Sequence, residues 1–313
     1  MVSIKGAMKK IVTILDMVFP EQIIFQRRLK IPTAIVFFLF LCFLFSVVAT
    51  IIPVNGFIAY DWVYFFSVGN IPSWYQPWTI SIIHFLNYPI LIGITCAAFS
   101  MATFLRSVNR LSAIASFLCL PLIWVIFLGQ IDGLALFGML GLPWLVPFAL
   151  LKPHITFFGL GAKKTYIIAF FIWMIISVLI YGDWFPAIRD FNTYYPVGEW
   201  SHNISLGWWG VPFFLATVWF SRGDMDMLMA SGAFVTPTLL FYHLLPLTPA
   251  VARLKPKTAF IAVFLSFLTL SSNWLGPKGW YLGWTFIVWI WINLAAKRYP
   301  KIKISKWVNR FAG

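Results

Sequence analysis

The stretch Ile31–Pro53 reads IPTAIVFFLFLCFLFSVVATIIP. It contains no charged residue and no polar run, and it is longer than the about 20 residues that a helix needs to cross a bilayer. Inside a bilayer the backbone has no water to bond with, so such a run satisfies its N–H and C=O groups as a helix. The stretch therefore predicts a membrane-spanning helix.

The rest of the chain has the same character. Of its 313 residues, 61% are hydrophobic and only 10% are charged, with a mean hydropathy of +0.87. Soluble domains are nearer half apolar and a quarter charged, and their cores cannot bury this much apolar surface. We expect an all-α, polytopic transmembrane bundle of about ten spans. The nine further spans are predicted at 79–104, 111–129, 132–150, 165–182, 206–221, 224–236, 238–253, 257–273 and 279–297.

Basic residues gather at the two ends of the chain. Six of the 23 lie in the first thirty positions and six more between Lys297 and Arg310. Basic clusters that flank apolar runs mark cytoplasmic segments. We therefore expect an interfacial amphipathic helix in 1–30, one transmembrane domain over 31–297 and a basic cytoplasmic tail at 298–313. The predicted location is a multi-pass protein of a bacterial plasma membrane with both termini cytoplasmic. Its expected partners are membrane lipids.

The net charge of +14 also raises the possibility of a nucleic-acid partner. That function needs a solvated basic face with interleaved aromatic side chains, which the sequence lacks. The three cysteines all fall inside apolar runs without metal-ligand spacing, so we expect neither a metal nor a nucleic acid.

The span count between 206 and 253 depends on Thr236-Pro237. If this dipeptide is a turn between two short helices, nearly all lysines and arginines fall on the cytoplasmic side. Nine spans would instead place Arg253, Lys255 and Lys257 outside with the basic tail. The charge bias favours ten. Spans this short need protection inside the bundle.

The nine acidic residues divide into three groups. Asp16 and Glu21 lie in the N-terminal helix, and Asp224 and Asp226 are expected to cap a helix start in a cytoplasmic turn. The others are predicted on the outer side: Asp61, Asp132, Asp183, Asp190 and Glu199. Two long outer loops, 54–78 and 183–205, combine such carboxylates with many aromatic residues. An interfacial aromatic belt explains the aromatics but not the carboxylates, so a site open to the outside is an equal alternative.

Four short motifs follow one another in the first half of the chain. They are Tyr60-Asp61-Trp62-Val63-Tyr64, Tyr75-Gln76-Pro77 before the second span, Gly129-Gln130-Ile131-Asp132 at an outer turn, and Lys152-Pro153-His154 after the fourth span. Thr236-Pro237 and Tyr242-His243 come later. Their order resembles the GT-C membrane glycosyltransferases, in particular the bacterial polyprenol-phosphate-mannose-dependent mannosyltransferases. The resemblance covers roughly 55–160 and 225–250, and the family's chains are usually longer.

The resemblance implies an inverting transfer of a sugar from a polyprenyl-phosphate donor on the non-cytoplasmic face. It implies no cofactor beyond the lipid-linked sugar, and it matches Asp61 to the general base. A base in this role needs hydrogen-bond reach to the acceptor hydroxyl. The candidate substrate-binding residues are Trp62, Tyr64, Tyr75, Gln130, Asp132 and His243, followed by Lys152, His154 and Arg189.

Other interpretations stay open for several of these residues. Asp132 is equally an N-cap, and for His154 a role in helix packing or at the interface is favoured over that of a ligand. The ten-span topology places Lys152 on the cytoplasmic side, far from the outer loops, where it would serve as a positive anchor. Two other functions compete: a transporter with Asp61 and Asp132 as ligands, and a non-catalytic subunit that binds lipid or partner helices. Acids deep within spans would favour a transporter, and none of the outer five lies there.

Overall fold

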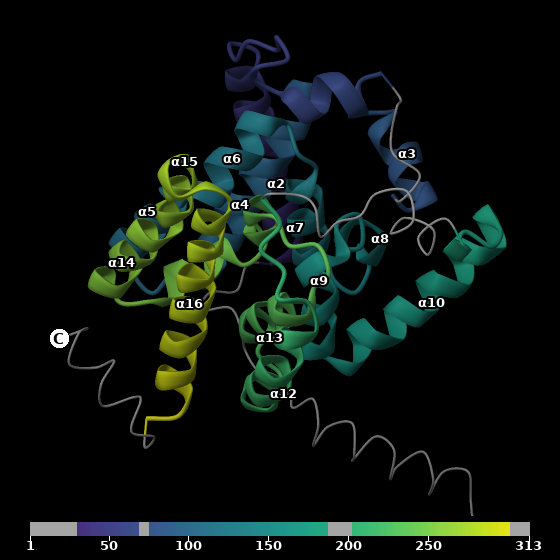
Figure 1. Cartoon of the computed structure of the whole chain (residues 1–313). Helices are drawn as coiled ribbons and strands as arrows, with labels where there is room; N and C mark the ends of the chain where they lie inside the picture. Colours follow the sequence, from purple (N-terminus) through teal and green to yellow (C-terminus); the bar gives the residue numbers. More distant parts are fainter. Residues whose placement is uncertain (1–29, 69–74, 187–201, 301–313) are drawn as a thin grey trace, which may run out of the picture.

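The computed structural model describes residues 30–68, 75–186 and 202–300 (Figure 1). All regular structure within these ranges is helical, which confirms the predicted all-α class. The predicted N-terminal amphipathic helix, most of the basic tail and most of the 183–205 loop, with Arg189, lie outside the described residues.

The first half of the described chain forms long and short helices. They are α2 (Ile31–Ala49), the short π-helix η1 (Trp62–Phe66), α3 (Pro77–Ile83), α4 (Tyr88–Arg106), α5 (Arg110–Phe117), α6 (Leu120–Leu128), α7 (Asp132–Leu140), α8 (Val146–Ala149), α9 (Pro153–Gly159), η2 (Leu160–Ala162) and α10 (Lys164–Tyr181).

The second half is built from shorter pieces. They are η4 (Gly207–Trp209), α12 (Gly210–Ser221), α13 (Met225–Gly232), η5 (Ala233–Val235), η6 (Phe241–Leu244), η7 (Thr248–Arg253), α14 (Pro256–Phe267), η8 (Leu268–Ser271), α15 (Ser272–Leu275), η9 (Gly276–Leu282) and α16 (Gly283–Arg298). The helical path stops at Thr236 and resumes at Phe241, which agrees with the predicted turn at Thr236-Pro237.

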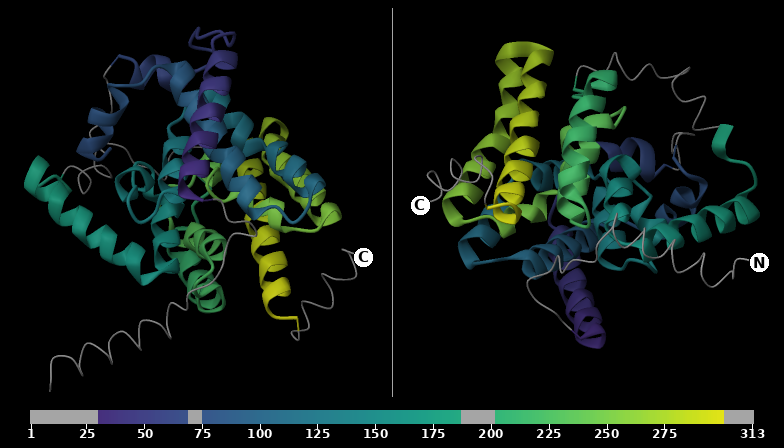
Figure 2. Two further views of the ribbon diagram at one scale, coloured as in Figure 1. Left: turned by 180° about the vertical axis from the view of Figure 1, so that it is seen from behind. Right: turned by 90° about the horizontal axis from the view of Figure 1, so that it is seen from below.

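Five helical stretches of the described chain are long and apolar enough to cross a membrane. They are Ile31–Ala49, Tyr88–Arg106, Arg110–Leu128, Lys164–Tyr181 and Pro256–Arg298. The last one folds into a hairpin, since α14 packs against α16 (Figure 2). The predicted second span is interrupted, because Asn87 accepts a hydrogen bond from Ile90 N and starts α4 as a new helix with Pro89 in its first turn.

Helix α4 is the centre of the first half and packs against α2, α7 and η7. Small residues allow the close approach. A Cβ on Gly93 would lie 2.7 Å from Cys42 O of α2, and a Cβ on Gly133 of α7 would collide with Thr95 of α4. Such contacts drive helix association in membranes, where apolar side chains gain little by leaving lipid. By contrast, α2 and α10 expose most of their apolar side chains, as lipid-facing helices do.

The predicted continuous span 132–150 is wrong. Helix α7 ends at Leu140, the chain turns through Gly141–Leu145, and α8 packs back against α7. The approach is so close that a Cβ on Gly138 would collide with the backbone of Ala149. The chain therefore returns toward the end of α7 from which it started.

A buried network of ion pairs joins the two halves at α4, α13 and η7. Arg106 Nε donates to Asp226 Oδ1 at 3.0 Å, and both side chains are at most 1% exposed. Arg253 donates to Asp226 Oδ2 at 2.8 Å and to Asp224 Oδ2 at 2.7 Å. As predicted, Asp224 is also the N-cap of α13. The burial of Asp226 and its pairing with Arg106 are not visible in the sequence.

Candidate functional site

Asp61 lies directly before η1, in a loop that is held on the end of α6. Ala59 N donates to Phe127 O at 2.7 Å, and Ala59 has a φ of 64°, in the left-handed region that non-glycine residues rarely adopt. Gly129 follows α6 with a φ of 72°, and a Cβ there would lie 2.7 Å from Trp62 Cβ. A glycine is needed at this position for both reasons. These contacts place Asp61 beside the residue that follows Gly129.

That residue, Gln130, links three segments of the chain. Its Nε2 donates to Asp61 Oδ2 at 2.6 Å and to the Tyr242 hydroxyl of η6 at 3.3 Å. Gln130 is 4% exposed, and its Oε1 is buried without a partner. The amide thus holds one carboxylate oxygen of Asp61 in place and leaves an acceptor of its own available within the site.

Lys152 belongs to the same cluster. Its Nζ lies 4.9 Å from the ring centre of Tyr75 and 5.8 Å from that of Tyr242, and the residue is 6% exposed. Burial lowers the pKa of Lys152, but Tyr75, Asp132 and Asp61 raise it by more, so the net shift is upward. The side chain is a buried ammonium flanked by aromatic faces and carboxylates.

The placement of Lys152 corrects the topology expected from the sequence. A straight span at 132–150 would have carried it to the opposite end from Asp61. Because α7 and α8 form a tight hairpin instead, the chain brings Lys152 back to the start of α7 and to the first loop. A cationic side chain therefore faces the same site as Asp61.

Two carboxylates surround this ammonium. Burial raises the pKa of Asp61 above its ordinary value, and the Gln130 hydrogen bond and the Lys152 charge lower it by less. Asp132 is 1% exposed in the first turn of α7, and its Oδ2 is buried without a partner. The N-cap of α7 is Ile131, so capping does not explain Asp132.

Two histidines stack next to Lys152. The rings of His154 and His243 are 3.8 Å apart at an interplanar angle of 24°. His243 Nδ1 accepts from Leu240 N at 3.2 Å, which assigns the ring proton to Nε2. That Nε2 is buried without a partner. Burial, and then Lys152, lower the pKa of His154 to about 3, so this ring is neutral near pH 7.

Two further candidates, Trp62 and Tyr64, take part in aromatic contacts of their own. Trp62 is buried and packs on Tyr88 and Phe66, while Tyr64 is 51% exposed with its ring 4.7 Å from that of Tyr60. Tyr242 was missed as a site residue, although it stands in the quoted Tyr242-His243 motif. Its position next to His243 was the only signal for it in the sequence.

Within residues 30–68, 75–186 and 202–300, no group of three or more His, Cys, Asp or Glu side chains could hold a metal ion. The cluster offers two carboxylates, one ammonium, an amide and an imidazole N–H. This set can accept a proton and bind an anion at the same place. Comparison with protein families, curated proteins and solved structures finds no match to the chain.

Proposed function

We propose that the chain is a multi-pass membrane glycosyltransferase of the GT-C type, which transfers a sugar from a polyprenyl-phosphate donor. The observation that supports it best is the meeting of Asp61, Gln130 and Tyr242 with the buried ammonium of Lys152. These residues come from four separate segments. The order of motifs that resembles the family thus coincides with one polar cluster in a highly apolar protein.

Asp61 would act as the general base. Its carboxylate takes the proton of an acceptor hydroxyl while the oxygen attacks the anomeric carbon of the donor. The bond from that carbon to the phosphate oxygen breaks, and its electron pair leaves with the polyprenyl phosphate. The raised pKa of Asp61 makes it a stronger base once it is ionised. Gln130 fixes one carboxylate oxygen, so the other can face the acceptor.

Lys152 and His243 would bind the leaving phosphate. The ammonium supplies positive charge, and the unpartnered His243 Nε2–H supplies a hydrogen bond. Both groups are buried, where charge interactions are stronger than in water. The negative charge that develops on the leaving oxygen is then stabilised by groups that are already in position.

The proposed arrangement in the membrane is the one that the apolar runs and the charge bias of the sequence predict. The five long apolar stretches would span the bilayer. The short helices of the second half would lie inside the bundle, as part of a GT-C-like arrangement of about ten membrane segments. The termini would be cytoplasmic and the Asp61 cluster would open to the outer face.

A donor-consumption assay tests the proposal. The purified protein is reconstituted in liposomes with polyprenyl-phosphate sugars radiolabelled in the sugar and with heat-treated bacterial membrane extract as the supply of acceptor hydroxyls, and loss of label from the lipid is measured. Asp61→Asn should abolish the loss. Asp183→Asn is the matched control, because Asp183 is an exposed carboxylate outside the Asp61 cluster. Its Oδ1 accepts a hydrogen bond from Phe185 N, and the amide oxygen of asparagine can accept the same bond. Equal rates for Asp61→Asn and the parent would refute the assigned base. If the parent consumes none of the donors, a non-catalytic subunit becomes the better hypothesis.

A further inference from the structure

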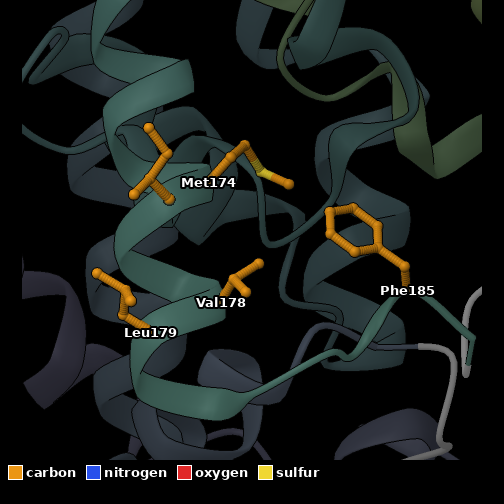
Figure 3. A pocket seen from close by; sticks show the side chains of 5 residues that line it. Met174, Val178, Leu179 and Phe185 are labelled. Carbon is orange, nitrogen blue, oxygen red and sulfur yellow. The ribbon is translucent and has the colours of Figure 1, made fainter.

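An apolar groove along α10 and the buried polar cluster around Lys152 differ in how well they identify a ligand. The groove has a volume of about 330 Å³ and is lined by Met174, Ile175, Val178, Leu179 and Phe185 (Figure 3). This lining is wholly apolar, so it does not distinguish one apolar molecule from another. In the cluster, by contrast, Asp132 Oδ2 is a buried carboxyl oxygen without a partner. Such atoms are rare in folded proteins and call for an explanation.

Asp132 has a fixed position at the start of α7. The helix packs so closely on α4 that a Cβ on Gly133 would collide with Thr95, and Asp132 itself is 1% exposed. The negative charge of Asp132 raises the pKa of Lys152 and that of Tyr75. The carboxyl group therefore lies within electrostatic reach of the buried ammonium and of the ring that flanks it.

Asp132 and Asp61 share the ammonium of Lys152 but differ in their surroundings. Asp61 is half-buried, and Gln130 donates a hydrogen bond to its Oδ2 at 2.6 Å. Asp132 is almost fully buried, and no hydrogen bond reaches its Oδ2. Burial disfavours a charged carboxylate, and a hydrogen bond to the charged form favours it. The negative charge therefore resides on Asp61, and Asp132 keeps its proton.

The electrostatics of the cluster agree with this assignment. Burial raises the pKa of Asp132 to about 7, while Lys152 and the backbone N–H of Asp132 lower it by less. Burial also keeps two phenols and two imidazoles of the cluster neutral near pH 7, because it raises the pKa of a phenol and lowers that of a histidine. These groups are Tyr75, Tyr242, His154 and His243.

The charges of the cluster then decide the state in which it can bind a phosphate. Lys152 and ionised Asp61 carry opposite charges, which cancel. If Asp132 were ionised as well, the cluster would be anionic before an anion entered, and like charges repel strongly in a buried site. We infer that Asp132 is a neutral acid that donates a hydrogen bond from its Oδ2–H to a phosphate oxygen of the donor lipid. The inference rests on the proposed function and adds a donor to Lys152 and His243.

The proton of Asp132 stays on its carboxyl group throughout the reaction. Asp61 takes the proton of the acceptor hydroxyl, and the bonds that form and break are those of the proposed transfer. A protonated carboxyl group is a hydrogen-bond donor, and its bonds to an anion are strong. The two carboxyl groups thus have different functions because their surroundings differ, one as a base and the other as a neutral donor.

Binding of a phosphodiester tests the inference without sugar transfer. The probe is tritium-labelled polyprenyl methyl phosphate, whose single charge stays constant near neutral pH because only phosphate monoesters lose a second proton there. Its affinity for the purified full chain in detergent micelles is measured by scintillation proximity over a series of pH values. The affinity should fall by up to about tenfold for each pH unit above the pKa of Asp132. An affinity that stayed constant over this range would overturn the inference.

Substitutions assign the fall to Asp132. Asp132→Asn keeps a neutral donor of the same shape that cannot ionise, so its affinity should not fall as the pH rises. Asp132→Leu lacks a donor and should bind the probe about tenfold or more weakly than Asp132→Asn. Asp61→Asn should still show a fall, because Asp132 can still ionise, and Asp183→Asn is the control with an exposed carboxylate replaced.

Two results would contradict the role of Asp132. One is the same fall with pH in Asp132→Asn as in the parent, and the other is equal affinity of Asp132→Leu and Asp132→Asn. The pH series of the parent needs no substitution, so it decides the question even if a variant fails to fold.

The binding series and the donor-consumption assay fail separately. Binding that does not depend on pH, together with donor consumption, would refute the role of Asp132 and leave the proposed function standing. Binding that falls with pH as expected, without any donor consumption, would support Asp132 and refute the enzyme. A parent that bound no probe at any pH would refute the phosphate site and with it the inference.

Discussion

The buried ion pair between Arg106 and Asp226 gives a prediction that is independent of the function. Asp226→Asn keeps the shape of the side chain and removes one negative charge from a place that is 0% exposed. Arg253 retains its two bonds to Asp224, so the loss falls mainly on the guanidinium of Arg106, which is 1% exposed.

The expected cost is large. Removing one partner of a buried ion pair destabilises a protein by about 3–5 kcal/mol, because it leaves a buried charge without compensation. For a chain of this size each kcal/mol lowers the melting temperature by roughly 2–4 °C, so the variant should melt on the order of 10 °C below the parent. Replacing both charges, as Arg106→Met with Asp226→Leu, should cost less than Asp226→Asn alone, since the ion pair is then replaced by apolar side chains of similar volume.

The measurement is a thermal melt of the detergent-purified chain, with Asp183→Asn as the control. Asp183 is exposed, and substitutions at such positions change stability by about 0.5 kcal/mol or less. If Asp226→Asn melted within about 2 °C of the parent, or if the double variant were the less stable of the two, the reasoning on the buried network would be wrong.

Three further predictions concern the polar cluster. Lys152→Gln should weaken polyprenyl-phosphate binding by about thirtyfold or more, because a charged hydrogen bond worth about 2 kcal/mol is lost. Binding is measured by competition with a photoreactive polyprenyl phosphate, and equal competition curves for variant and parent would exclude Lys152 from the phosphate site. Donor consumption should fall as the pH is lowered through the pKa of Asp61, which burial raises, so the acid limb should lie above the ordinary carboxyl range of about 4; an acid limb below pH 4 would contradict this. The same raised pKa gives Asp61 a stabilising contribution to folding at low pH. That contribution is fully present below the pKa of Asp61 in the unfolded chain, and it is lost as the pH rises through the pKa in the folded chain. For His154 the sign is opposite, since its pKa falls from 6.5 to about 3; the folded chain should lose stability as the pH drops from 6.5 toward 3, and His154→Gln should flatten this part of a melting-temperature profile.

Much of the candidate site was visible in the sequence because its residues stand in short, ordered motifs. Asp61, Gln130 and His243 were named from the motifs that carry the family resemblance, and the structure brings Asp61 and Gln130 into direct contact. Charged and polar residues are costly near lipid, so the few that a membrane chain retains are informative. Tyr242 carries no such signal, because the chain has eleven tyrosines and tyrosine is common at membrane interfaces without any role in a site.

Lys152 shows where reasoning from local sequence failed. The stretch 132–150 is apolar enough to be read as one span, but Gly141 and Pro143 interrupt it and α8 folds back onto α7. The glycine and proline were the available signal for a break. They do not tell on which side the returning chain emerges, because that depends on the close packing at Gly138.

The sequence by itself determined that the chain is helical and suited to a bilayer, because apolar composition and backbone hydrogen bonding act locally along each run. It also predicted the helix break at Thr236-Pro237, where proline acts on its own neighbours, whereas the break at Asn87 was not predicted. Only the tertiary structure decided that Lys152 meets Asp61 and that Arg106 meets Asp226, 120 positions apart. Such pairings arise from how whole helices pack, and no local pattern of residues specifies them.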